Sequence, residues 1–144
     1  MESGTPSGGD GATAPLVLVC DDSEPIRRLI RINLELDGFA VAEATDGQAA
    51  LVWLRDNDVL PAVVTFDAFM EPRDGWWAVA AMRADPRLAG IPAVMVTASV
   101  QIHDRVQARE SGFDAFVTKP FDPDHLLEVV SHLAAAGRGW FGPQ

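Results

Sequence analysis

Five short apolar runs alternate with longer amphipathic segments along most of this chain, and this alternation constrains its fold more than any other feature. Each run predicts a β-strand; the runs cover residues 16–20, 39–42, 62–66, 93–96 and 115–117. Strands that alternate with helices form βαβ units, which place the strands in a parallel sheet with helices on both faces. The sequence therefore predicts one α/β domain with a five-stranded parallel sheet and five helices.

The segments between the runs contain helix signals. Ser23 can cap a helix that has Pro25 in its first turn and Gly38 as its stop. Ile26, Leu29 and Ile30 are expected to face inward. The four further helices are predicted from Asp46 onward and over residues 75–84, 102–111 and about 122–136.

The two ends of the chain differ from its middle in composition. Residues 1–14 are mostly Gly, Ser, Thr, Ala and Pro, which predicts a disordered tail, and residues 15–136 form the domain. Residues 137–144 are too rich in glycine for a helix and form a C-terminal tail or the start of a linker. Trp140 and Phe141 in this stretch either anchor the tail on the domain or belong to the linker.

Charge and cysteine content limit the classes of function. The chain has 11 basic and 21 acidic residues and a formal net charge of −10, the wrong sign for holding phosphate backbones. It has no apolar stretch long enough to cross a bilayer and no secretory signal at its N-terminus. Its single cysteine cannot form an internal disulfide. We therefore expect a cytoplasmic protein that binds neither nucleic acid nor membrane directly.

Polar residues follow the predicted strands at one edge of the sheet. Asp21 and Asp22 follow the first strand, Asp67 the third, Thr97 the fourth and Lys119 the fifth. In open parallel sheets, ligands bind beyond the carboxyl ends of the strands where the winding reverses. Three clustered carboxylates repel one another unless cations are present, and one Mg²⁺ together with one ammonium group balances their charge. Such a site can accept a phosphoryl group on a carboxylate.

Four motifs with these residues resemble the receiver domain of two-component response regulators. The motifs are Cys20–Ser23, Asp67–Gly75, Val96–Ala98 and Gly112–Phe121, and the resemblance covers about residues 15–136. It implies a flavodoxin-like three-layer αβα sandwich with strand order 2-1-3-4-5. It also implies that Asp67 accepts a phosphoryl group from a phosphohistidine on a sensor histidine kinase or a histidine phosphotransfer protein.

The resemblance further assigns roles to individual residues. Asp22, Asp67 and the backbone carbonyl of Phe69 would ligate Mg²⁺, and Asp21 would help through water. Thr97 and Lys119 would hold the phosphoryl oxygens.

Three more expectations concern the switch and the neighbouring loops. Phe116 matches an aromatic position that turns inward when Thr97 moves to the phosphate. Lys119-Pro120 matches a peptide bond that is usually cis. One departure from the family pattern is the loop Met70-Glu71-Pro72, in which proline comes one position later than usual. This departure affects the expected loop conformation and not the chemistry.

The leading functional hypothesis is a stand-alone receiver that assists its own magnesium-dependent phosphorylation and dephosphorylation and signals by binding a downstream protein. The signalling surface is expected on residues 102–111, 115–117 and 122–136, which could also pair two copies as a homodimer. One alternative is the receiver fragment of a larger regulator. A magnesium-dependent phosphatase ranks lower, because Phe69 stands where such enzymes have a second acid. A flavin carrier is an alternative that only the predicted fold supports.

Two further groups of residues have simpler interpretations. His103, His125 and His132 are expected at or near the surface of predicted helices. Trp76 and Trp77 are adjacent on a helix and cannot both point into the core. One of them is therefore either exposed near the site, as a partner contact, or partly covered by the long loop before the helix, and we favour the partial cover.

Overall fold

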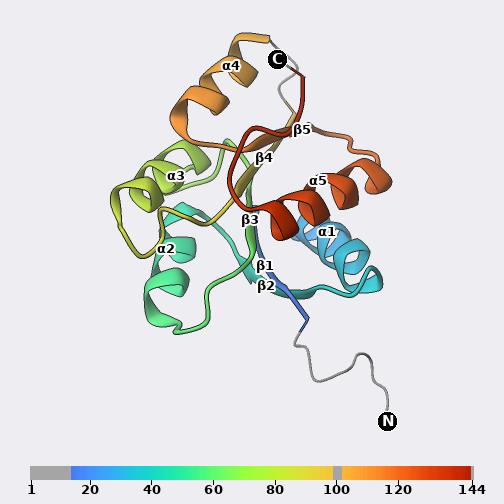
Figure 1. The fold of residues 1–144 in the computed structure, drawn as a ribbon, viewed down its shortest axis with the longest axis horizontal. Helices are drawn as coiled ribbons and strands as arrows, with labels where there is room; N and C mark the ends of the chain where they lie inside the picture. Colours follow the sequence, from blue (N-terminus) through green and yellow to red (C-terminus); the bar gives the residue numbers. More distant parts are fainter. Residues whose placement is uncertain (1–13, 99–101, 144) are drawn as a thin grey trace.

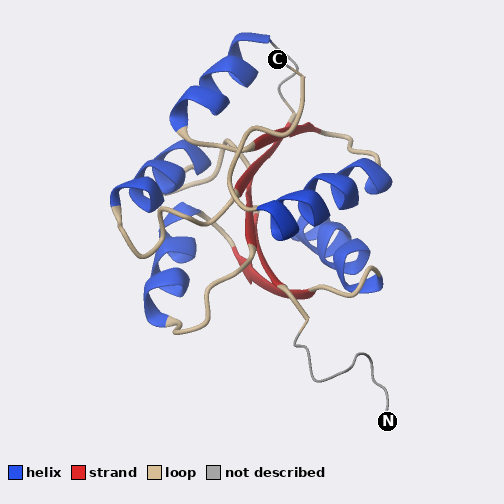
Figure 2. Ribbon diagram, viewed as in Figure 1, coloured by secondary structure: helices blue, strands red, loops and turns tan. Residues whose placement is uncertain are grey.

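The computed structural model describes residues 14–98 and 102–143 and has three layers, a central sheet between two groups of helices (Figure 1). Within the described residues the strands are β1 (Leu16–Cys20), β2 (Ala40–Ala44), β3 (Val63–Phe66), β4 (Ala93–Thr97) and β5 (Ala115–Thr118). The helices are α1 (Glu24–Leu36), α2 (Gly47–Asp56), α3 (Gly75–Ala84), α4 (Ile102–Ser111) and α5 (Pro123–Ala136). Figure 2 shows α1 and α5 on one face of the sheet and α2, α3 and α4 on the other. Except for Ala14, the predicted disordered tail lies outside the described residues.

The strands lie in the order β2-β1-β3-β4-β5, and all neighbouring pairs are parallel. The chain therefore passes from β1 to β2 on one side and returns to β3 on the other, so the winding reverses between β1 and β3. This arrangement confirms the predicted flavodoxin-like fold. It also places the carboxyl ends of β1 and β3 side by side, where parallel sheets bind ligands.

The helices begin at the polar residues that cap them. The side chains of Ser23, Asp46, Asp74 and Asp122 each accept a hydrogen bond from a backbone N–H of the first helical turn. These bonds satisfy donors that have no partner within the helix. The caps expected at Ser23 and Asp46 are confirmed.

Two hydrophobic clusters fill the spaces on either side of the sheet. Alternate residues of a strand point to opposite faces, so Val64 and Phe66 of β3 join the cluster under α2 and α3, and Val63 joins the one under α1 and α5. The prediction that Leu29 faces inward is wrong, because its exposed fraction is 46%. The buried side of α1 follows the four-residue spacing of Ile30 and Leu34, and Leu29 lies about 100° around the helix from Ile30.

Both tryptophans of α3 are half-buried, so neither is fully exposed to solvent. The ring of Trp76 meets the edge of Phe113 with centroids 5.7 Å apart and an interplanar angle of 90°. The guanidinium of Arg73 lies over the ring of Trp77, 5.1 Å from its centroid. The loop before α3 therefore partly covers Trp77, as the interpretation favoured from the sequence expects.

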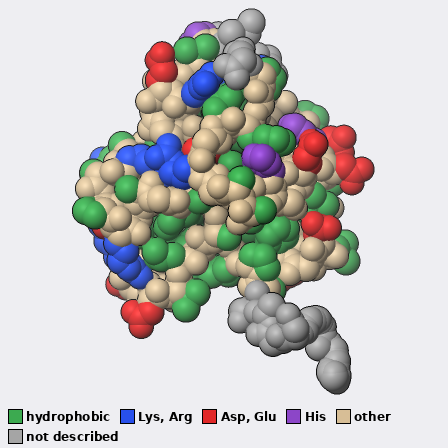
Figure 3. All heavy atoms as spheres, viewed as in Figure 1, with side chains coloured by type: hydrophobic (Ala, Val, Ile, Leu, Met, Phe, Trp, Pro, Cys, Tyr) green, Lys and Arg blue, Asp and Glu red, His purple; other side chains and the backbone are tan. Residues whose placement is uncertain are grey.

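The three histidines are exposed, as expected for surface positions on α4 and α5. Figure 3 shows histidine side chains, in purple, at the surface of the face drawn. No described helix is both long and apolar enough to span a membrane.

Glu43 on the edge strand β2 forms two ion pairs with α1. Arg31 Nη1 and Arg27 Nε each lie 2.7 Å from a Glu43 carboxylate oxygen. Hydrogen bonds from Arg31, which has the larger effect, and from Arg27 lower the pKa of Glu43 below its ordinary value. These bonds therefore stabilise the fold above the ordinary glutamate pKa of about 4.3, and their contribution is lost as the pH falls through the lowered value.

We expect Glu43→Gln to reduce the free energy of unfolding by about 1 kcal/mol at pH 7, because the pairs are partly exposed. The difference between the two proteins should shrink as the pH falls below about 4.3. Urea denaturation at a series of pH values measures both effects. A difference that stays constant down to pH 3 would contradict this account of Glu43.

Candidate functional site

Three carboxylates meet at the point where the winding of the sheet reverses. Asp21 and Asp22 follow β1, and Asp67 follows β3. One oxygen from each lies within 4.8 Å of the others, a group that could hold a metal ion. Asp21 is buried, Asp67 nearly so and Asp22 exposed, so the group is open to solvent on the Asp22 side. The structure thus brings together the three acidic residues singled out from the sequence.

Lys119 supplies the positive charge next to this cluster. Its Nζ lies 2.7 Å from Asp21 Oδ2 and 3.5 Å from Asp67 Oδ2. The other oxygen of Asp21 accepts a hydrogen bond of 2.9 Å from the backbone N–H of Ser23. Asp21 is therefore held by two donors, whereas Asp67 has a looser contact with the same ammonium group.

The electrostatic environment distinguishes Asp67 from an ordinary surface aspartate. Burial raises the pKa of Asp67, and the Lys119 ammonium acts in the opposite direction. The neighbouring Asp21 carboxylate raises this pKa further. A cation added to the cluster would relieve the repulsion between these carboxylates and favour the ionised form of Asp67.

Backbone contacts position Lys119 and Thr97 at the ends of neighbouring strands. The N–H of Lys119 donates a hydrogen bond of 2.8 Å to the carbonyl oxygen of Thr97. Thr97 is buried at the end of β4, and the peptide bond between Lys119 and Pro120 is cis, as the family resemblance implies. The two residues predicted to hold phosphoryl oxygens are therefore joined through their backbones, Thr97 at the end of β4 beside β3 and Lys119 just after β5, the next strand of the sheet.

The loop after Asp67 forms one wall of an open depression beside the carboxylates. The backbone N–H of Phe69 donates a 3.4 Å hydrogen bond to Asp67 Oδ1, and the Phe69 ring is 67% exposed. The depression has a volume of about 600 Å³ and is lined by Asp22, Phe69, Met70, Glu71, Pro72 and Asp74. The displaced proline of this loop follows a second cis peptide bond, Glu71-Pro72.

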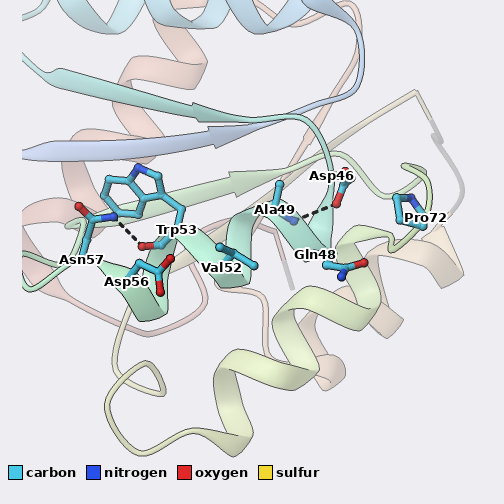
Figure 4. Close-up of a pocket in the computed structure, with 8 residues that line it drawn as sticks. All are labelled: Asp46, Gln48, Ala49, Val52, Trp53, Asp56, Asn57 and Pro72. Atoms are coloured by element: carbon cyan, nitrogen blue, oxygen red, sulfur yellow. Dashed lines mark hydrogen bonds between the residues drawn. The ribbon is translucent and has the colours of Figure 1, made fainter.

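A second depression lies along α2, and Pro72 lines both (Figure 4). Two of its polar side chains, those of Asp46 and Asn57, have partners within the chain. Asp46 Oδ1 accepts a hydrogen bond from the N–H of Ala49, and Asn57 Nδ2 donates one to the carbonyl of Trp53. This surface therefore combines polar and apolar side chains of α2 with Pro72, and the three clustered carboxylates do not line it.

Two glycines that the sequence analysis did not single out allow the backbone around the site to pack closely. A Cβ on Gly75 would come closer to the carbonyl oxygen of Asp67 than side chains tolerate. A Cβ on Gly47 would lie 2.7 Å from the carbonyl oxygen of Asp74 and 2.8 Å from that of Arg73. Gly75 thus lets α3 begin directly against Asp67, and Gly47 lets the loop pack on the start of α2.

We expect Gly75→Ala to displace the backbone of Asp67 and to reduce the free energy of unfolding by about 1–3 kcal/mol, the usual cost of overpacking. Thermal unfolding measures the loss. Gly90→Ala is a matched control, because a Cβ on Gly90 would meet no heavy atom within 4 Å. Equal melting temperatures for the two variants would show that the start of α3 can move away from Asp67 at no cost.

Comparison with known proteins decides the family. Residues 17–131 match the family model described as the response regulator receiver domain. The chain belongs to this family. The recognition made from the four motifs is therefore confirmed, and the protein is a receiver of the two-component type.

Several individual proteins resemble this receiver. The DNA-binding dual master transcriptional regulator RpaA of Synechocystis sp. is 38% identical over 122 residues, which are 83% of this chain and 48% of that protein. An uncharacterized 14.6 kDa protein of Leptolyngbya boryana is 34% identical over 83% of this chain and 90% of its own length. The chemotaxis response regulator CheY4 of Vibrio cholerae superposes with a TM-score of 0.76 at 27% identity, covering 84% of this chain and 99% of that one. The chain spans about half the length of RpaA and most of the length of the other two.

Phe116 lies apart from the carboxylate cluster. It is half-buried on β5, and the guanidinium of Arg105 from α4 lies 5.6 Å from its ring centroid. Its switch role stays a prediction, as do the roles assigned to Thr97, Lys119 and the three aspartates.

Proposed function

We propose that this receiver accepts a phosphoryl group on Asp67 from a phosphohistidine of a sensor histidine kinase or a histidine phosphotransfer protein. The observation that supports this most strongly is the position of the Lys119 ammonium, 3.5 Å from Asp67 Oδ2 within a cluster of three carboxylates. Membership of the response regulator family supports the same donor class.

In the proposed step, a carboxylate oxygen of Asp67 attacks phosphorus and the P–N bond to the donor histidine breaks. The imidazole nitrogen leaves with the electron pair, and an acyl phosphate forms on Asp67. Lys119 neutralises the charge on a phosphoryl oxygen, and the Thr97 hydroxyl donates to another. Hydrolysis of the same acyl phosphate by water returns the carboxylate and releases inorganic phosphate, so the chain assists both its own phosphorylation and its own dephosphorylation.

The donor set fits magnesium, because carboxylate and carbonyl oxygens with open access to water are what this ion prefers. Asp22, Asp67 and the Phe69 carbonyl would hold it directly, and Asp21, both of whose oxygens already accept hydrogen bonds, would act through water. When bound, the ion supplies positive charge next to the phosphoryl oxygens.

The proposed output is binding to a downstream protein through α4, β5 and α5, controlled by Phe116, with a homodimer through the same surface as one form of it. We place this signalling in the cytoplasm, as the single cysteine suggests. The second candidate is the receiver part of a larger regulator, which the greater length of RpaA favours. An aspartyl phosphatase is not favoured, because Phe69 stands at the position of the required acid.

The test is incubation of the full chain with acetyl phosphate, with and without Mg²⁺, followed by intact mass measurement. A mass gain of one phosphoryl group that requires Mg²⁺ supports the proposal. Hydroxylamine should remove the gain, because it cleaves an acyl phosphate and not a phosphoserine. An unchanged mass under all conditions would contradict the proposed function.

A further inference from the structure

Residues 138–143 fold back on the domain after α5, and we call them the docked segment. α5 ends at Ala136 and is capped by Gly137, whose φ of 82° is accessible to glycine and whose N–H donates to the carbonyl of Leu133 at 2.9 Å. From there the chain passes β5 towards α4, as the dark red trace in Figure 1 shows. The docked segment therefore reaches the free edge of the sheet, where β5 is the outermost strand.

The docked segment binds the buried aspartate that precedes β5. Arg138 Nε lies 3.2 Å from Asp114 Oδ1, and the N–H of Gly139 donates to the same oxygen at 3.0 Å. The N–H of Phe141 donates to the backbone carbonyl of Asp114 at 2.7 Å. Arg83 of α3 pairs with the second carboxylate oxygen at 3.2 Å. Asp114 is only 1% exposed, so these bonds satisfy a charge that would otherwise be costly to bury.

Two aromatic rings connect the docked segment to the helices on either side of β5. The Phe141 ring stacks on His132 of α5 with centroids 4.1 Å apart and an interplanar angle of 18°. The guanidinium of Arg109 from α4 lies over the Trp140 ring, 5.6 Å from its centroid. The segment therefore contacts α5, the start of β5 and α4 at once.

The same face of α4 contacts the predicted switch residue. Arg105 and Arg109 are four residues apart and lie on one side of the helix. Arg105 lies over Phe116 and Arg109 over Trp140. Among the α4 side chains that the structure describes, Ala108 alone is buried. Because this buried face is small, the ring contacts of Arg105 and Arg109 add to the packing that holds α4 on the domain.

We infer that the docked segment fixes α4 against the β5 edge in the unphosphorylated chain and that phosphorylation of Asp67 weakens this docking. The coupling rests on the proposed function, since it begins with the movement of Phe116. If Phe116 turns inward, Arg105 loses its ring, α4 shifts, and the contact of Arg109 with Trp140 weakens. The segment then leaves the edge of β5, where unpaired backbone groups can bind another chain.

The first measurement needs no phosphorylation. Hydrogen exchange of the full chain is followed by mass spectrometry for Trp140→Ala, with Leu36→Ala on α1, which is 83% exposed, as a matched apolar control. Loss of one cation–π contact should speed exchange in α4 by about two- to fivefold, and the control should leave α4 unchanged. Unchanged exchange in β1 and β3 shows that the variant is folded. Equal α4 exchange in Trp140→Ala and the parent would overturn the inference.

The second measurement tests the coupling. With acetyl phosphate and Mg²⁺, the amides of Gly139 and Phe141 should exchange faster in the parent and should not change in Asp67→Asn. Because coupling is reciprocal, Trp140→Ala should also reach a higher phosphorylated fraction than the parent. Unchanged exchange at these amides in a chain whose mass includes the phosphoryl group would overturn the coupling. A chain that takes up no phosphoryl group contradicts the proposed function. In that case the first measurement alone decides whether the docked segment fixes α4.

Discussion

Asp67→Asn is expected to abolish the magnesium-dependent mass gain from acetyl phosphate completely. Asparagine matches aspartate in size and keeps an oxygen near Lys119, so the surrounding loop should keep its position. Its amide is a far weaker nucleophile than a carboxylate, and it cannot form the acyl phosphate. The melting temperature of the variant in chelator should not fall, because burial and the nearby Asp21 carboxylate both disfavour the charge of Asp67.

A second variant separates the acceptor from the residues that assist it. Asp22→Asn removes a carboxylate from the same cluster and leaves Asp67 intact. It should slow phosphorylation and raise the Mg²⁺ concentration required, yet it should still reach a mass gain after long incubation. A full mass gain in Asp67→Asn would assign the acceptor to another residue. If Asp22→Asn lost the gain completely at the same time, that residue would be Asp22.

The parts of this structure that were predictable from sequence are those with local causes. The carboxyl ends of β1, β3 and β4 are marked by the change from an apolar run to a polar residue, so Asp21, Asp67 and Thr97 could be placed at one edge without coordinates. Helix caps such as Ser23 and Asp46 act on the next few residues, and they too were predicted. The meeting of the three carboxylates then followed from the parallel direction of the strands.

The parts that were missed depend on contacts between distant residues. Gly75 must lack a Cβ because the Asp67 carbonyl packs against it, and no local pattern indicates this. For the residues after α5, composition left an anchor and a linker equally open, and the difference lies in Asp114, whose buried carboxylate accepts hydrogen bonds from Arg138 and Gly139.

Magnesium should stabilise the fold through the carboxylate cluster, and this is the second large effect that we expect. An ion that binds only the folded chain adds RT ln(1 + [L]/Kd), about 2.7 kcal/mol at about 100 Kd. For a chain of this size, that corresponds to a rise in Tm of roughly 5–10 °C. Asp22→Ala should remove most of this rise in Tm. Asp22 is the exposed member of the cluster, and its carboxylate lies on the side of the site that is open to solvent.

Glu71→Gln is the matched control for the loss of one negative charge. Glu71 lines the same depression as Asp22 but does not belong to the group of three carboxylates. If general screening of acidic residues caused the stabilisation, both variants would reduce it equally. If a site of defined oxygen ligands causes it, only Asp22→Ala does, and in chelator that variant should melt no lower than the parent because one repulsive charge is gone. Differential scanning calorimetry with saturating Mg²⁺ and with EDTA distinguishes the two cases, and a parent Tm that is identical in both solutions would exclude this metal site.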